Sequence, residues 1–98
     1  MIFIYIFNLI KKDMNKIIQI SDELFWGFNI VINLDNYNSF DELAFLLKNE
    51  LIVFLRTHNL LNLLDKANNL NLHHHMFNNY EDLYRIEYDT IYFCGGCR

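Results

Sequence analysis

Proline is absent from this chain of 98 residues, and glycine occurs only three times. Linkers and disordered segments are usually rich in these two residue types, so nothing in the sequence marks a domain boundary. Hydrophobic residues make up 53% of the chain, whereas disordered chains are depleted in them. We therefore expect a single folded domain over residues 1–98, with a core that is small because the chain is short.

Basic residues are scarce as well. Eight Lys and Arg stand against twelve Asp and Glu, which gives a formal net charge of −4. Proteins that bind nucleic acid usually present a concentrated basic face, so we expect no nucleic-acid partner. Lys11, Lys12 and Lys16 form a local excess of positive charge. Their pattern favours solvated turn residues between strands over a small positive patch.

The sequence also lacks an apolar run long enough to span a bilayer, which takes ~20 residues. Residues 1–10 are apolar, but Lys11 and Lys12 follow the run, whereas a signal peptide carries its positive charge before it. The β-branched and aromatic content of the run predicts a buried strand. Met14 is an alternative start, so residues 1–13 are either that strand or a dispensable extension. We expect an intracellular protein of a reducing compartment such as the cytoplasm.

Asparagine, by contrast, is abundant, with 14 residues, and Ile, Leu, Phe and Tyr are frequent. These residue types have codons rich in A and T, so the bias indicates an AT-rich genome. It favours a large DNA virus as the source over ciliates, apicomplexans and social amoebae. The bias concerns the origin of the gene and says nothing about the function of the protein.

Strand patterns occupy the first third of the chain. Residues 17–20 form a short candidate strand, and residues 24–34 restart the β pattern after a polar turn. Within the second segment, residues 28–34 are the clearest strand and Gly27 marks a bend or bulge. These segments predict two or three strands of a meander.

Helix signals follow. Residues 39–42 (Ser-Phe-Asp-Glu) have the form of a capping box, in which Ser39 accepts a hydrogen bond from the amide of residue 42. The Glu42 carboxylate is expected to accept from the amide of residue 39. Apolar residues then recur at the spacing of one helix face, which predicts a helix over about 40–57.

A second, shorter helix is predicted over about 60–68, because His58 and Asn59 interrupt the pattern and Asn is a good cap. A single kinked helix from 40 to 67 is the alternative. Strand patterns return at 70–77 and 88–93, with a helical turn at 80–84 between them. The prediction is an α+β fold in which a small, mainly antiparallel sheet packs against one helical hairpin.

The strongest chemical signal lies near the end of the sequence. Four side chains there, two imidazoles and two thiols, form the ligand set of a closed tetrahedral zinc site: His73, His75, Cys94 and Cys97. The sequence thus predicts a structural Zn²⁺ that clasps a C-terminal β-hairpin. The spacing matches no standard zinc finger.

Strand geometry allows the four ligands to meet. Residues two apart on a strand share a face, so His73 and His75 point one way and His74 the other. Antiparallel pairing of 71–77 with 88–94 is expected to place His73 opposite Tyr92, with Cys94 diagonal to it on the same face. Gly95 and Gly96 are then expected to use positive φ, which turns Cys97 back toward the metal.

Three alternatives remain open. The histidines could be partly exposed strand residues and the cysteines terminal thiols with no joint role. His74 could replace a neighbour if the register slips, and His58 is expected to be a helix-end residue. The thiols could run thiol–disulfide exchange, but only Arg98 follows Cys97, so no helix N-terminus activates a thiolate.

The function that this pattern favours is a non-enzymatic, zinc-stabilised interaction or structural module, a subunit of a larger assembly. The alternative is a small zinc-dependent enzyme or thiol oxidoreductase. A full shell of two His and two Cys leaves no open position for water, so we assign no catalytic residue. With only three ligands, a carboxylate of the adjacent loop could act as general base: Glu81, Asp82, Glu87 or Asp89.

The chain carries more apolar residues than a small core can hold. Leu46, Ile52, Val53, Leu61 and the strand at 2–7 all require burial in addition to the regular helix face. We therefore expect a protein partner or a homodimer, with the wide flank of helix 40–57 or the N-terminal strand at the contact. Trp26 and Phe25, beside Gly27, are the candidate aromatic anchors. A compact monomer that buries all of these groups is the alternative.

Overall fold

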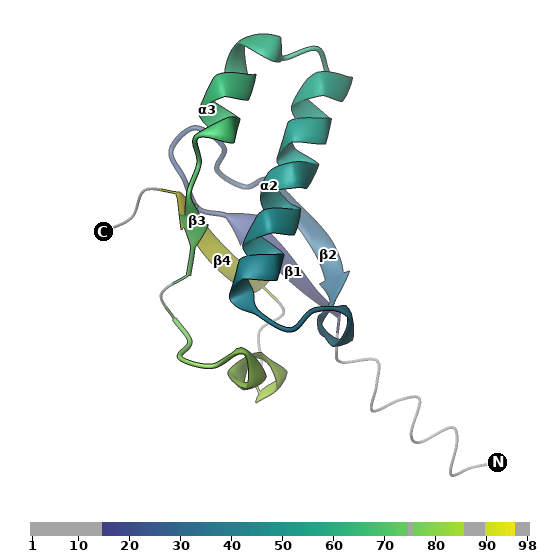
Figure 1. The fold of residues 1–98 in the computed structure, drawn as a ribbon, viewed down its shortest axis with the longest axis vertical. Helices are drawn as coiled ribbons and strands as arrows, with labels where there is room; N and C mark the ends of the chain where they lie inside the picture. The colour runs from purple at the N-terminus through teal and green to yellow at the C-terminus, as the bar shows by residue number, and fades with distance from the viewer. Residues whose placement is uncertain (1–14, 75, 86–89, 96–98) are drawn as a thin grey trace, which may run out of the picture.

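The computed structural model describes residues 15–74, 76–85 and 90–95, in two layers with the helices over one face of a four-stranded sheet (Figure 1). The strands are β1 (Asn15–Ile20), β2 (Asn29–Asn33), β3 (Leu72–His73) and β4 (Thr90–Gly95), and the α-helices are α2 (Phe40–Thr57) and α3 (Leu64–Asn68). Three short 3-10 helices connect them: η2 (Leu34–Asn36), η3 (Leu61–Leu63) and η4 (Tyr80–Arg85). The strand predicted within residues 1–10 lies outside the described residues.

The sheet has the order β2-β1-β4-β3. β1 pairs antiparallel with β2 and β3 antiparallel with β4, but the two central strands, β1 and β4, run parallel. The fold is therefore a small α+β fold, as predicted, and its sheet is mixed: two of the three strand pairs are antiparallel, and the central pair is parallel. Alternation along a strand identifies its buried face but carries no information on the direction of its neighbour.

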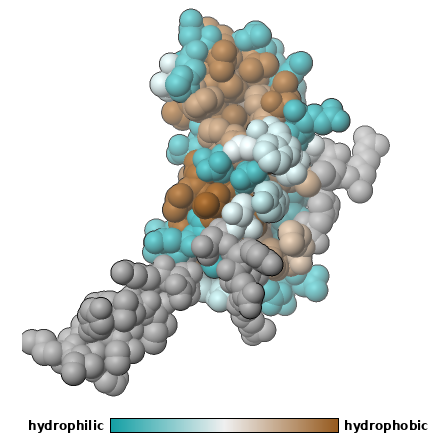
Figure 2. All heavy atoms as spheres, turned by 180° about the vertical axis from the view of Figure 1, so that it is seen from behind, coloured by the Kyte–Doolittle hydropathy of each residue, from teal (hydrophilic) through white to brown (hydrophobic). Residues whose placement is uncertain are grey.

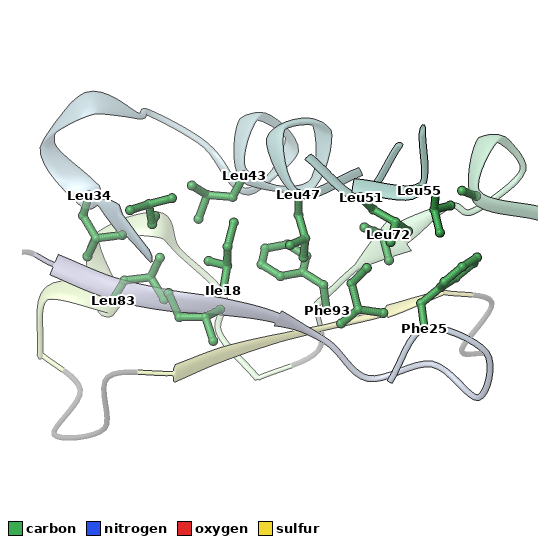
Figure 3. Close-up of a cluster of buried hydrophobic side chains, with 14 residues drawn as sticks. Ile18, Phe25, Leu34, Leu43, Leu47, Leu51, Leu55, Leu72, Leu83 and Phe93 are labelled. Carbon is green, nitrogen blue, oxygen red and sulfur yellow. The ribbon is translucent and has the colours of Figure 1, made fainter. Parts of the chain in front are cut away.

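The core lies between the sheet and α2 (Figure 3). Alternate residues of the central strands point toward the helix and are buried, namely Ile18, Ile20, Ile91 and Phe93. On α2 the buried residues recur every fourth position, at Leu43, Leu47, Leu51 and Leu55. One face of each layer is thus covered by the other, which is the arrangement that the two sequence periods predict.

The N-terminus of α2 is capped by side chains on both sides of the first turn. The Ser39 hydroxyl accepts from the backbone N–H of Glu42 at 3.3 Å. The Glu42 carboxylate accepts from the N–H of Asn38 at 2.6 Å, one residue before the predicted partner. The capping interaction is therefore confirmed, with its second bond shifted outward by one residue.

Asn59 ends α2 with a positive φ of 59°. The N–H of Leu60 donates to the carbonyl of Leu55 at 2.8 Å, and the N–H of Asn59 donates to that of Arg56 at 3.1 Å. This pair of bonds is the Schellman motif, which stops a helix and turns the chain away from it. α2 and α3 are therefore separate helices, as predicted, and the alternative of a single kinked helix from 40 to 67 is excluded.

The connection from β1 to β2 is a turn. The N–H of Ile20 donates to the carbonyl of Phe28 at 2.8 Å, and the N–H of Gly27 donates back to the carbonyl of Ile20 at 3.0 Å. Gly27 has a φ of +90°, which a residue with a Cβ rarely adopts. The predicted strand therefore begins at Asn29 and not at residue 24.

Lys16 corrects a prediction. It was expected in a solvated turn, but it lies within β1 on the helix-facing side and is only 4% exposed. Strand alternation explains the placement, because Lys16 shares its face with Ile18 and Ile20. Lys11 and Lys12 lie outside the described residues.

Candidate functional site

Two of the four predicted zinc ligands lie directly opposite each other in the sheet. His73 in β3 is the cross-strand partner of Cys94 in β4, and both side chains are half-buried. Residues opposite each other in an antiparallel pair have Cβ atoms ~4.5–5.5 Å apart and share a face of the sheet. Zinc holds nitrogen and sulfur at ~2.0–2.3 Å, so an imidazole and a thiolate at this spacing suit one tetrahedral ion.

The register of this pair differs from the predicted one. His73 was expected opposite Tyr92 with Cys94 diagonal to it, but the register is shifted by two residues along β4. β3 is only two residues long because the chain leaves the sheet at His74. The connection then carries Leu83 into the core, where it is 0% exposed, so a packed segment and not a simple loop sets the register.

Gly95 serves a different purpose from the predicted one. It lies inside β4, and among the described glycines only Gly27 has a positive φ. A Cβ on Gly95 would stand 2.6 Å from Cδ2 of Leu70 and 3.6 Å from Cδ2 of Leu72. Glycine is needed there because the residues around β3 pack closely over the backbone of β4.

His75, Cys97 and the turn at Gly96 lie outside the described residues. Within residues 15–74, 76–85 and 90–95, no group of three or more His, Cys, Asp or Glu side chains is placed to hold a metal ion. The structure thus brings one imidazole and one thiol of the predicted ligand set together. The complete zinc site stays a prediction.

The side chain of His74 points to the side opposite to that of His73, as strand alternation predicts. Its ring stacks on Phe40 with centroids 3.4 Å apart, and its Nε2 lies 2.9 Å from the carbonyl oxygen of Phe77. Phe40 in turn makes an edge contact with Tyr80. His74 therefore ties the end of β3 to the start of α2, which is a structural role.

The carboxylates that were candidates for a general base are only partly described. Asp82 accepts from the N–H of Asn79 at 3.4 Å, so it caps η4. The η4 helix is fixed to η2 by the Tyr80 hydroxyl, which donates to the carbonyl of Leu34 at 2.9 Å. Burial, with smaller contributions from Tyr84 and Glu42, holds the pKa of Tyr80 well above its ordinary value. Glu87 and Asp89 lie outside the described residues.

Lys48 is a structural residue that no pattern in the sequence indicates. Its ammonium group donates to the carbonyl of Asn68 at 2.6 Å and to that of Leu70 at 2.9 Å. The Asn68 carbonyl belongs to the last turn of α3 and the Leu70 carbonyl lies two residues beyond it, where backbone acceptors lack helical partners. Lys48 thus joins α2 to the end of α3.

An apolar surface surrounds Trp26, whose side chain is 69% exposed on the β1–β2 turn. The described residues that line a hollow of about 320 Å³ beside it are all aliphatic or aromatic: Leu24, Phe25, Trp26, Phe28, Leu51, Phe54, Leu55, Leu60 and Leu63. We call its exposed rim, formed by Leu24, Trp26, Phe54 and Leu60, the Trp26 surface. Of the two predicted anchors, Trp26 is exposed, whereas Phe25 is buried, with 7% of its surface exposed.

A groove runs along the open edge of β2, between this strand and α2. Three adjoining hollows of about 310 to 380 Å³ share lining residues with their neighbours, including Leu46 and Glu50. We call them together the β2 groove. Phe45 and Val53 on its wall are 69% and 55% exposed. Leu46 and Ile52, which were predicted to overflow the core, pack partly against it.

Figure 2 views the face opposite to that of Figure 1 and shows apolar surface in two places. One lies at the end of the molecule that carries α3, and the other lies on the side that carries β2.

No helix among the described residues is long and apolar enough to cross a membrane. Comparison with family models, curated proteins and solved structures gives no match.

Proposed function

We propose that the chain is a non-enzymatic interaction module, which binds a protein partner through the Trp26 surface and carries a structural Zn²⁺ at the β3–β4 pair. The observation that carries the proposal is the exposure of Trp26 at the rim of a hollow whose described lining residues are all aliphatic or aromatic. Trp is the residue type most enriched among those that dominate the energy of protein interfaces.

The chemistry of the hollow defines its occupant. The nine described residues that line it are all aliphatic or aromatic, and the indole N–H of Trp26 is the one polar side-chain group among them. Its volume of about 320 Å³ lies at the lower end of the range for ligand pockets, ~300–1,000 Å³. Aliphatic or aromatic side chains of a partner protein fit both the size and the lining.

The zinc ion has a role in holding the fold. Among the described residues, β3 and β4 pair at two positions, which give this edge of the sheet little backbone support. A metal bound by His73 and Cys94, with His75 and Cys97 as the remaining ligands, adds a cross-link at this position. Structural zinc contributes directly to folding free energy and requires deprotonated thiols, in accord with a reducing compartment.

The interaction is tested by photo-crosslinking in the cells that make the protein. A photoreactive amino acid replaces Leu61, which is 57% exposed and next to the Trp26 surface, and in a control it replaces Met76, which is 70% exposed. Figure 1 draws the segment that follows β3 at the end of the fold away from α3. A partner crosslinked from position 61 and not from 76 is then purified for affinity measurements.

The expected result is that Trp26→Ser weakens binding of this partner at least about tenfold, the effect of a typical interface hot spot. Met76→Ser, which removes an equally exposed apolar side chain, is expected to leave the affinity unchanged. Equal crosslinking from positions 61 and 76, or equal affinity of the two variants, would contradict the proposal.

A further inference from the structure

Within residues 15–74, 76–85 and 90–95, β2 is an edge strand, and no described strand pairs with its outer side. Among the described strands it has one neighbour, β1, and the sheet order places it at the end. Charged residues, proline and β-bulges usually prevent an edge strand from pairing with another chain. β2 contains none of these three features. Such an edge is a template for an added strand.

The hydrogen-bonding groups on the open side can be assigned from the ladder with β1. The N–H of Ile20 donates to Phe28, and this pair continues the register in which Ile18 lies opposite Ile30. Bonded and non-bonded pairs alternate along an antiparallel ladder. The N–H and C=O groups of Asn29, Val31 and Asn33 therefore point away from β1.

The sequence of β2, Asn-Ile-Val-Ile-Asn, is the same in both directions about Val31. We propose that two copies of this chain pair through β2 about a twofold axis at Val31. Asn29 then lies opposite Asn33 of the second copy, and Val31 lies opposite its own counterpart. The Val31 pair exchanges two backbone hydrogen bonds, and at each end the outward N–H of Asn33 donates to the carbonyl of Asn29 of the other copy, because the Asn33 carbonyl already caps η2. The two sheets become one.

Side chains support the same axis on both faces of the sheet. Val31, which is 70% exposed on the face away from the helices, gains an identical apolar neighbour. On the helix side, Leu46 and Glu50 line the groove beside the middle of β2, so both β2 grooves join into one channel at the axis. Phe45 and Val53, exposed in the single chain, stand on the walls of that channel.

The area is sufficient for a weak dimer. The β2 groove extends along α2 from Glu42 to His58, a length of ~24 Å, and the two layers are together ~20 Å deep. Two such flat footprints cover ~1,000 Å², which is at the lower limit of specific interfaces. We therefore expect a Kd of about 1 to 100 μM and not a permanent dimer.

Glu50 opposes the association. It lines the middle of the groove, so pairing brings two Glu50 carboxylates into one channel, and none of the described residues that line the three hollows is a Lys or an Arg. Like charges at such a contact reduce affinity and are screened by salt. Glu50→Gln and added salt should therefore both increase the affinity of the two copies for each other. Few other surface substitutions are expected to increase it.

Sedimentation velocity of the full chain from about 1 to about 300 μM brackets the expected Kd. Val31→Pro removes the N–H that points outward at the axis. This N–H is not bonded to β1, and an edge strand tolerates proline at such a position. Val31→Pro is expected to weaken dimer affinity at least tenfold. Val31→Lys, which places a charge at the same exposed site, is expected to have an equal effect. Val31→Thr keeps the β preference and serves as the matched control, with a change below threefold.

Amide hydrogen exchange reads the proposed register directly. Exchange at Val31 should slow as protein concentration rises, because its N–H is bonded only in the dimer. Exchange at Ile30 should not depend on concentration, because its N–H is bonded to β1 within one chain. Trp26→Ser is expected to leave the dimer intact, so this inference and the proposed function fail independently. A monomer at all concentrations, or a dimer that resists both Val31→Pro and Val31→Lys, would overturn it.

Discussion

The imidazole of His74 stacks on the ring of Phe40, with centroids 3.4 Å apart and planes 24° apart. His73, its neighbour, faces the other side of the sheet and lies opposite Cys94. Two consecutive histidines thus have separate tasks, one in the packing between β3 and α2 and one beside a thiol. Substitution of each residue should therefore affect a different property of the protein.

His74→Ala should lower the free energy of unfolding by about 1–3 kcal/mol, through loss of an aromatic stack and a hydrogen bond, and leave metal content unchanged. His73→Ala should reduce metal affinity. Denaturant unfolding and metal analysis of both purified variants provide the comparison. Loss of metal in His74→Ala together with full retention in His73→Ala would show that the assignment of the two faces to metal and core is reversed.

Removal of the metal should destabilise the protein. We expect one zinc ion per chain, a lower Tm in the presence of a chelator, and a similarly low Tm for Cys94→Ser. Protons compete with the metal for the thiolate and imidazole ligands, so zinc affinity should fall as pH falls. Thr90→Ser, on the same face of β4, is the control. Identical melting with and without chelator in a metal-free chain would contradict the zinc site.

The contact of Lys48 with the end of α3 gives a third prediction. Lys48→Met keeps most of the aliphatic stem but leaves the carbonyls of Asn68 and Leu70 without this donor. Unfolding free energy should fall by about 1.5–3 kcal/mol, the range for hydrogen bonds to a charged group. Lys66→Met, at an exposed position within α3, is the control. Equal stability of both variants would show that the ammonium contacts contribute nothing.

Local signals predicted α2 with both ends correct. Its start depends on Ser39 and its end on Asn59, and both residues act on backbone groups within a few positions of themselves. The partners of the strands could not be predicted in the same way. The parallel pairing of β1 with β4 joins residues far apart in sequence, and no local pattern encodes it.

The prediction that His73 and Cys94 share a face of the sheet is correct although the predicted register is wrong, and the reason is geometrical. The observed register of β3 and β4 differs from the predicted one by two residues, and a shift by an even number keeps every side chain on its face. His73 and Cys94 were therefore expected on one face and are found there. Lys48 could not be identified, because its acceptors are backbone carbonyls and any residue supplies those.

Tyr80 makes the stability of the protein sensitive to alkaline pH. Burial is the main cause that raises the pKa of its phenol in the folded state, and its hydroxyl donates to the carbonyl of Leu34. The unfolded chain begins to release this proton near pH ~10, whereas the folded chain retains it. A raised pKa stabilises the fold at lower pH, so this contribution is complete below pH ~10 and is lost as pH rises toward the folded pKa.

Tyr80→Phe isolates this contribution, because most other groups that titrate at alkaline pH are common to both proteins and cancel in the difference. At neutral pH the wild type should be more stable by about 1 kcal/mol, the value of one hydrogen bond. Above pH ~10 this advantage should shrink by up to ~1.4 kcal/mol per pH unit and then change sign. Denaturant unfolding at several pH values measures the difference. A difference that stays constant from neutral to strongly alkaline pH would mean that Tyr80 ionises as readily in the folded protein as in the unfolded chain.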